Sequence, residues 1–175
     1  MLELIQGEGG VRVADKSYFQ EVRRFCNSTG CLLIFDEVQT GMGRTGNLFA
    51  YELFDVEPDI MTLAKALANG LPMGAMLATE RAAQGFAVGS PATTFGGPPL
   101  VASAAFAALS IISKPEFLQE CRETGEYFRN KLKSLKSKDS VIKDVRGKGL
   151  LIGVELEVEA APVVEKCLKK GFIIN

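Results

Sequence analysis

The chain has 175 residues, 47% of them hydrophobic, and carries 20 Lys plus Arg against 21 Asp plus Glu. Such an apolar fraction excludes a disordered chain, and the length suits one domain, or one domain and part of a second. A net charge of −1 provides no electrostatic attraction to nucleic acid or to an acidic membrane, so we expect neither partner.

The chain contains no histidine, which narrows the possible chemistry. Catalysis by Ser-His-Asp or Cys-His groups is excluded, so acid-base work must fall to Lys, Asp, Glu or Tyr. The four cysteines form no CxxC pair and have no histidine to complete a zinc site. We therefore expect free thiols in a reducing compartment, and no metal site.

No apolar run approaches the ~20 residues of a membrane span, and the N-terminus lacks the basic region and apolar core of a signal peptide. These features predict a cytoplasmic protein. Strand-like sequence begins at residue 2, and the chain ends inside the apolar run GFIIN. We expect either a fragment of a longer protein or a chain whose neighbouring strands are supplied elsewhere.

The first third of the chain predicts a βαβ unit. Residues 2–5 read as a short strand, the glycines that follow as a turn, and residues 15–29 as an amphipathic helix. Residues 31–35 form a continuous apolar run, which is typical of a strand covered on both faces. The two strands of such a unit are expected to be parallel.

The middle of the chain alternates short elements. We predict a short helix at 48–54, strands at 60–64 and 73–78, a short helix at 81–87 and a loop at 88–99. The alanine-rich stretch from 100 to about 135 predicts a helix, interrupted near Lys114-Pro115.

The last third has a different character. Residues 141–157 predict two strands around a turn at Gly147–Gly149, followed by a helix at 160–170 and a last strand. The predicted fold is therefore α/β. Residues 1–99 belong to a large domain with a mostly parallel sheet and helices on both faces, 100–136 to a connecting long helix, and 137–175 to a smaller α+β domain.

Two charged residues follow neighbouring strands. Asp36 ends the strand at 31–35, and Lys65 ends the strand at 60–64. Ligands of open α/β sheets bind at the carboxyl ends of the strands, so both side chains are expected in one crevice. The alternative is a plain structural ion pair, which is common.

The sequence neighbours of Lys65 favour a catalytic role for this lysine over a structural ion pair. The lysine stands in LAKALA, and an apolar setting lowers the pKa of a lysine and makes it a usable nucleophile. Such lysines form Schiff bases with carbonyls, including that of pyridoxal 5'-phosphate (PLP). An acid opposite the pyridinium nitrogen keeps the PLP ring protonated, which would explain Asp36.

The motif GMGRTG (41–46) permits a competing interpretation as a dinucleotide-binding loop. That loop should follow its strand directly and open a helix, whereas DEVQT intervenes and brings carboxylates toward a pyrophosphate. We therefore interpret these glycines as a turn.

Five motifs occur in one order along the chain and are spread over most of its length: QGEGG (6–10), FDEVQTGMGRTG (35–46), PDIMTLAKALANGLPMGA (58–75), TTFGG (93–97) and RGKGLLIGVEL (146–156). Together they resemble the class III, or ornithine-type, aminotransferases of PLP fold type I, and most closely the acetylornithine-using branch. The resemblance implies transfer of the terminal amino group of acetylornithine, or a related omega-amino donor, to 2-oxoglutarate.

The resemblance also implies roles for single residues. Lys65 matches the lysine that holds PLP and shuttles the proton, and Asp36 the partner of the pyridinium nitrogen. The remaining cofactor contacts fall on Glu37, Val38, Gln39 and Thr94. Thr94 is expected to reach the PLP phosphate of a neighbouring subunit, which implies a homodimer with shared sites.

For substrate recognition, Thr93 is expected beside the substrate, and Glu3 matches the glutamate that pairs with a substrate-reading arginine.

Structural alternatives remain for several charged residues. Glu8 is expected to brace the QGEGG turn, and Arg44 to be a surface or interface charge. Arg146 and Lys148 are expected to shape a turn of the small domain. For Glu37, a purely structural role is as well supported as a cofactor contact.

Three positions depart from the family pattern: Leu4 replaces a proline, Pro91 a histidine and Pro98 an asparagine. The family's upstream phosphate loop, its stacking aromatic residue and its downstream arginine for the alpha-carboxylate have no counterpart here. A second hypothesis is therefore a catalytically inactive truncated segment that acts as a folding or dimerisation module.

Overall fold

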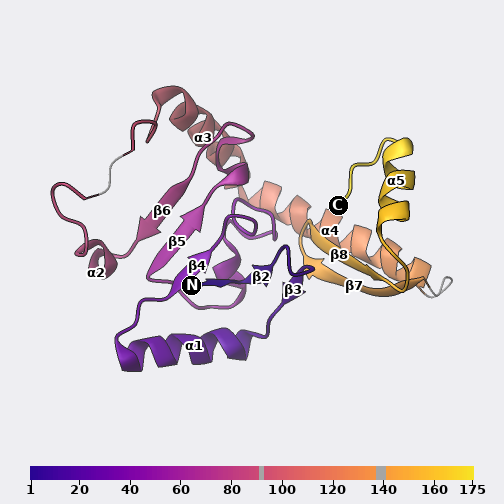
Figure 1. Cartoon of the computed structure of the whole chain (residues 1–175), viewed down its shortest axis with the longest axis horizontal. Coiled ribbons are helices and arrows are strands. Elements are labelled where there is room, and N and C mark those ends of the chain that lie inside the picture. The colour runs from indigo at the N-terminus through magenta and orange to yellow at the C-terminus, as the bar shows by residue number, and fades with distance from the viewer. Residues whose placement is uncertain (91–92, 137–140) are drawn as a thin grey trace.

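The computed structural model describes residues 1–90, 93–136 and 141–175. Its largest sheet has four strands in the order β1-β4-β5-β6 (Figure 1), formed by Leu2–Glu3, Ile34–Asp36, Ile60–Leu63 and Ala75–Ala78. β1, β4 and β5 are parallel, as predicted for the βαβ unit, whereas β6 runs antiparallel to β5. The short connection between β5 and β6, residues 64–74, explains this reversal, because a parallel return needs a longer crossover. The mainly parallel sheet confirms the α/β class.

The strand predicted at 2–5 is two strands. β1 ends at Glu3, and β2 (Ile5–Gln6) pairs in an antiparallel manner with β3 (Arg12–Val13). Leu4 lies between β1 and β2 and is fully buried. Where the family has a proline, this chain therefore places a leucine side chain in the core.

The predicted helices are present with shifted bounds. α1 covers Lys16–Thr29, η1 Ala50–Leu53 and α2 Glu80–Ala83, and a further short helix that was not predicted, η2, covers Lys65–Ala68. The long helix is interrupted as predicted, into α3 (Pro99–Ile112) and α4 (Pro115–Lys136), which are bent by 72°. Pro98 caps α3 with Pro99 in its first turn, where a missing amide costs nothing. In the described ranges no single helix meets the criteria for crossing a membrane, although the bent pair α3 and α4 meets them jointly.

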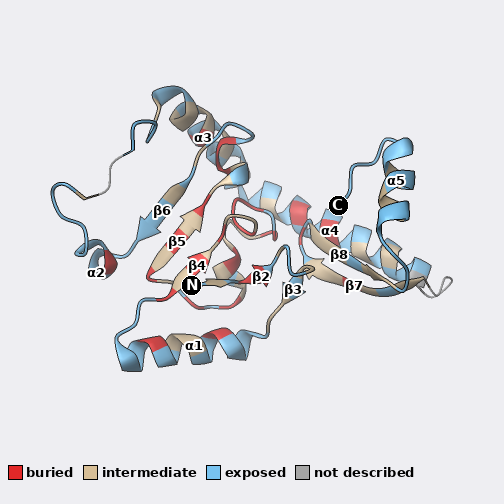
Figure 2. Cartoon of the chain, in the orientation of Figure 1, coloured by how far each residue is buried: buried red, intermediate tan, exposed pale blue. Residues whose placement is uncertain are grey.

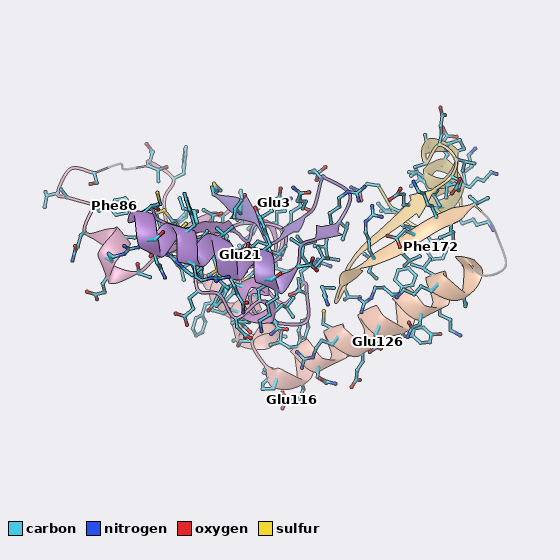
Figure 3. The ribbon with its side chains drawn as sticks, turned by 90° about the horizontal axis from the view of Figure 1, so that it is seen from below. Glu3, Glu21, Phe86, Glu116, Glu126 and Phe172 are labelled. Atoms are coloured by element: carbon cyan, nitrogen blue, oxygen red, sulfur yellow. The ribbon has the colours of Figure 1, made fainter. Side chains whose placement is uncertain are left out.

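A separate two-stranded sheet lies at the other end of the molecule. β7 (Ile142–Lys148) and β8 (Leu151–Leu156) are antiparallel around the predicted glycine turn, and α5 covers Ala161–Lys169. Phe86, which follows α2, and Phe172, which follows α5, lie toward opposite ends of the molecule (Figure 3). The prediction of a last strand is wrong, because residues 172–175 find no strand to pair with in the described part of the chain.

The core is built on one face of the large sheet. Phe35 of β4 and Leu33, the residue just before β4, pack in a cluster with Phe19 of α1. Met61 and Leu63 of the neighbouring strand β5 pack in a second cluster with Ala105 of α3. Phe35 and Met61 are register partners, so both clusters start from the same face. Buried residues accordingly gather along β4, β5 and the loop after β4 (Figure 2).

The opposite face of this sheet is only partly buried. It carries Ile34 and Asp36 from β4 and Ile60 and Thr62 from β5. The register aligns Asp36 with Glu3 on one side and with Thr62 on the other. The candidate functional residues therefore lie at the carboxyl edge of the less covered face.

Candidate active site

Asp36 ends β4 with its carboxylate partly engaged. Oδ1 accepts hydrogen bonds from the Val38 amide at 3.0 Å and from the Thr62 hydroxyl at 3.3 Å. Oδ2 has no hydrogen-bond partner among the described residues, and Asp36 forms no ion pair with Lys65. The structural ion pair considered from the sequence is therefore absent, and one carboxylate oxygen remains available to a ligand.

Glu37 points the other way from its neighbour. Its side chain is only 1% exposed and accepts hydrogen bonds from the Thr40 hydroxyl and from the amide of Tyr51 at 2.9 Å. Burial raises the pKa of this carboxyl, although its hydrogen bonds oppose the rise. The side chain thus lies in the core, away from Asp36.

Lys65 begins η2 directly after β5 and has a left-handed backbone, with φ of 48°. This conformation is uncommon for a lysine and costs on the order of 1 kcal/mol. Strain of this kind persists where the surrounding structure imposes it, often at functional sites. The backbone geometry therefore supports a functional role for Lys65.

The surroundings of Lys65 correct one prediction. Its apolar neighbours Leu63 and Leu67 turn into the second core cluster, while Lys65 itself is exposed. The expectation of an amine in an apolar setting was therefore wrong for this chain. The side chains of residues close in sequence can point in different directions, so apolar sequence neighbours do not guarantee an apolar environment for a lysine amine.

Lys65 shares a cavity of about 410 Å³ with two of the predicted cofactor contacts, Val38 and Gln39. The remaining lining residues are Gly41, Arg44, Ala66, Asn69, Gly70 and Leu151. This lining contains two cations and two amides but no carboxylate, which suits an anionic ligand. Sequence reasoning missed Asn69, whose left-handed φ of 49° before Gly70 was the available signal. Leu151 carried no such signal, because only tertiary contacts bring it to this cavity.

Glu3 and Glu8 make other contacts than those expected from the sequence. The Glu3 carboxylate accepts the Gly7 amide at 2.9 Å and so braces the QGEGG turn. Glu8 instead accepts a hydrogen bond from Gln39 Nε2 at 3.1 Å, and both line a second cavity of about 370 Å³. Glu8, which we expected only to brace the turn, therefore lies nearer the candidate cofactor contacts than expected.

Thr93 and Thr94 are exposed on the loop that precedes α3. Neither lines the cavity of Lys65, and this loop projects away from the sheet (Figure 1). Their predicted contacts with substrate and phosphate stay predictions. Pro91, the other departure near this motif, lies outside the described residues.

The glycine motif 41–46 is an attachment surface for the small sheet and α4. The carbonyl oxygens of Gly43, Arg44 and Gly46 accept hydrogen bonds from Cys121, Leu150 and Arg122, respectively. A loop of irregular structure and then η1 follow the motif, so the helix that a dinucleotide loop requires is missing. The interpretation as a turn is supported, with the added role of holding two parts of the chain together.

Close backbone approach explains the glycines at this junction. A Cβ on Gly149 would lie 2.4 Å from the Thr45 carbonyl carbon, and one on Gly125 would lie 2.0 Å from the Gly149 oxygen. Arg146 adds a second link, because its Nε donates to the Gly10 oxygen at 2.8 Å. Arg146 therefore joins the small sheet to the QGEGG turn, rather than only shaping its own turn as predicted.

Carboxylates and thiols of the described residues form no group that could hold a metal ion. All four cysteines are free.

Comparison with protein families matches the class-III aminotransferase model over residues 1–175. Among curated proteins, the chain is 51% identical over 175 residues to the acetylornithine aminotransferase of Methanocaldococcus jannaschii, covering 100% of this chain and 44% of that protein. It is 49% identical over 173 residues to the mitochondrial acetylornithine aminotransferase of Alnus glutinosa, covering 99% of this chain and 38% of that protein.

Solved structures give the same result. The N-acetylornithine aminotransferase of Stenotrophomonas maltophilia K279a aligns with a TM-score of 0.89 at 37% identity, over 99% of this chain and 46% of that one. An ornithine aminotransferase of Toxoplasma gondii, with PLP at partial occupancy in its active site, aligns with a TM-score of 0.93 at 36% identity, over 99% and 42%. The chain therefore spans less than half the length of these relatives.

Proposed function

Because this chain belongs to the class-III aminotransferases, which are PLP-dependent, we propose that the whole protein moves the terminal amino group of acetylornithine, or of a related omega-amino donor, to 2-oxoglutarate. The names of the similar curated proteins support the choice of donor. The observation that carries the proposal is the placement of Lys65, Val38 and Gln39 around one cavity at the carboxyl edge of a mainly parallel sheet.

The residues present fit PLP. The Lys65 amine is accessible for covalent attachment, and the Asp36 oxygen Oδ2 is available to the pyridinium nitrogen. Bound PLP supplies an electron sink for the carbanion of the amino donor. Within this scheme Lys65 carries the proton to and from the donor carbon, and Asp36 holds the ring nitrogen protonated.

The remaining site assignments belong to the same proposal. Val38 would pack on one face of the ring, and Gln39 would donate a hydrogen bond near its phenolic oxygen. Thr94 would reach the phosphate across the interface of a homodimer, with Thr93 beside the substrate. Glu3 pairs with an arginine that reads the substrate, although its carboxylate now accepts the Gly7 amide and would have to exchange this partner.

We propose that the reaction takes place in the cytoplasm, which fractionation with compartment markers would check. We also propose that the chain is divided into a large-domain part (1–99), a connecting helix (100–136) and a small-domain part (137–175). Limited proteolysis would test this division by the positions of the first cuts.

An inactive folding or dimerisation module is the second candidate. The exposure of Lys65 favours it, because the sequence led us to expect a reactive amine in an apolar setting. Apolar side chains on the surface favour it too, including Leu100 and Phe106 of the uncharged helix α3, which are 76% and 75% exposed. Such surfaces mark contact sites for other polypeptide.

The deciding experiment is an absorbance titration with PLP, followed by borohydride reduction and peptide mapping. Label found on Lys65, absent from Lys65→Ala and retained in the exposed control Lys148→Ala, would support the cofactor site. Label scattered over surface lysines would favour the module. Turnover of acetylornithine and 2-oxoglutarate then tests the reaction itself.

A further inference from the structure

We propose that Glu37 is a positioning residue, whose buried carboxylate holds the strand end so that Asp36, Val38 and Gln39 face the cofactor. The inference rests on the proposed PLP site at Lys65 and deepens it. It replaces the expectation that Glu37 itself contacts the cofactor, since the side chain lies on the opposite side of the chain from Asp36.

The carboxylate joins two separate segments. It accepts a hydrogen bond from the Thr40 hydroxyl, within the turn that follows β4. It also accepts the amide of Tyr51 in η1 at 2.9 Å. One side chain therefore attaches the turn after β4 to an element more than ten residues further along the chain.

The backbone of Glu37 is attached on the other side. Its amide donates to the Thr62 oxygen of β5 at 3.0 Å, and its carbonyl accepts the Gly41 amide at 2.9 Å. Side chain and backbone together fix Glu37 between β5 and η1. Asp36 and Val38 are each one peptide bond away, so a displacement of Glu37 moves both of them.

Burial makes this network costly to disturb. Glu37 is 1% exposed, and the structure pairs it with no cation among the described residues, so its hydrogen bonds alone compensate the lost hydration. Buried polar groups with incomplete hydrogen bonds are strongly unfavourable. An alanine here would lose this attachment, whereas glutamine keeps the shape but exchanges one acceptor oxygen for a donor.

The competing explanation is that Glu37 only stabilises η1. A matched control tests this, because Glu52 also accepts a backbone amide of this segment, that of Phe49 at 3.1 Å. Glu52 is exposed, accepts a further hydrogen bond from Asn47 and, among the described residues, accepts none from β4 or from the turn after it. The two glutamates therefore differ in whether they hold the strand end.

The experiment compares the protein with Glu37→Gln and Glu52→Gln by amide hydrogen exchange and by PLP titration. For Glu37→Gln we expect exchange in segment 36–41 to become about tenfold faster and PLP binding about tenfold weaker, with a displaced absorbance band. For Glu52→Gln we expect faster exchange only at 49–53, with PLP binding unchanged. Unchanged protection of 36–41 in folded Glu37→Gln would overturn the proposal, as would equal effects of the two variants.

A second pair of variants protects the test against misfolding. Thr40→Val removes one hydrogen-bond partner of Glu37, and Thr40→Ser keeps it. We expect Thr40→Val to loosen segment 36–41 about threefold and Thr40→Ser to restore protection; identical exchange in the two would contradict the proposal. If the unaltered protein binds no PLP at Lys65, the proposed function fails, while the exchange comparison still decides the role of Glu37.

Discussion

Acidic and basic residues lie at both ends of β4 and β5, but among the described residues they form ion pairs only at the amino ends. At the amino ends, Asp59 accepts hydrogen bonds from the Leu33 amide, from Arg23 and from Arg81, all at 2.7–2.8 Å. At the carboxyl ends, Asp36 and Lys65 form no ion pair, and Lys65 is exposed on a left-handed backbone. Acid and base are paired at one end of the sheet and left apart at the other.

This difference separates stability from function. Hydrogen bonds at the amino ends compensate the burial of Asp59, so its charge holds α1, β4 and the start of α2 together. At the carboxyl ends the chain keeps a strained lysine and a carboxylate oxygen with no partner in the part of the chain that the structure describes. Such arrangements stabilise the fold less, and they persist where a ligand completes them.

The largest expected effect is at the amino ends. Asp59→Asn leaves the Arg23 guanidinium, with a side chain 18% exposed, without its counterion. Breaking such a pair from one side is expected to lower the free energy of unfolding by about 4 kcal/mol. The control Asp55→Asn removes the exposed pair with Lys16 and should cost under about 1 kcal/mol. Urea unfolding measures both, and equal losses would contradict the comparison.

The next effect is at the carboxyl ends, where Gly149 contacts the loop after β4. Gly149→Ala places a Cβ within 2.7 Å of the Arg44 oxygen at a φ of 50°, so the small sheet must move away. We expect a loss of about 3 kcal/mol from overlap and backbone strain. Gly30→Ala has a positive φ but an open surrounding, and should cost about 1 kcal/mol. If the two variants unfold at the same urea concentration, the junction is looser than we infer.

Acid should weaken the amino ends selectively. Burial alone would raise the pKa of Asp59, but the hydrogen bonds from Leu33, Arg81 and Arg23 lower it to about 2 from 3.8. The folded pKa is the lower one, so this stabilisation is complete above pH ~4 and is lost as the pH falls toward ~2. We expect a loss of about 2 kcal/mol over this window.

Unfolding measured from pH 5 to 2 checks this prediction. The loss should shrink in Asp59→Asn and persist in Asp55→Asn. An unaltered pH dependence in Asp59→Asn would show that other carboxyls dominate acid unfolding.

The smallest effect concerns the strain at Lys65. Glycine adopts a φ of 48° without penalty, whereas alanine keeps the strain, so Lys65→Gly should be more stable than Lys65→Ala by about 1 kcal/mol. Both variants should lose covalent attachment of PLP. Thermal unfolding of the pair measures the difference. A more stable alanine variant would mean that the left-handed backbone relaxes at no cost.

The sequence by itself determined the local features of this protein. The apolar run before Asp36, the apolar run before Lys65 and the proline after Lys114 predicted two parallel strands and a broken helix, and all three are present. Local periodicity and backbone chemistry decide such features, because they depend on residues a few positions apart. The order of five motifs was likewise enough to indicate the family.

Only the tertiary structure decided where the side chains act. Glu37 lies in the core because the Tyr51 amide of η1 donates a hydrogen bond to it there, and Glu8 reaches Gln39 from a turn 31 positions earlier. Lys65 is exposed although its sequence neighbours are apolar. The predicted last strand is absent because residues 172–175 have no strand to pair with among the described residues. These outcomes depend on contacts between distant segments, which no local pattern encodes.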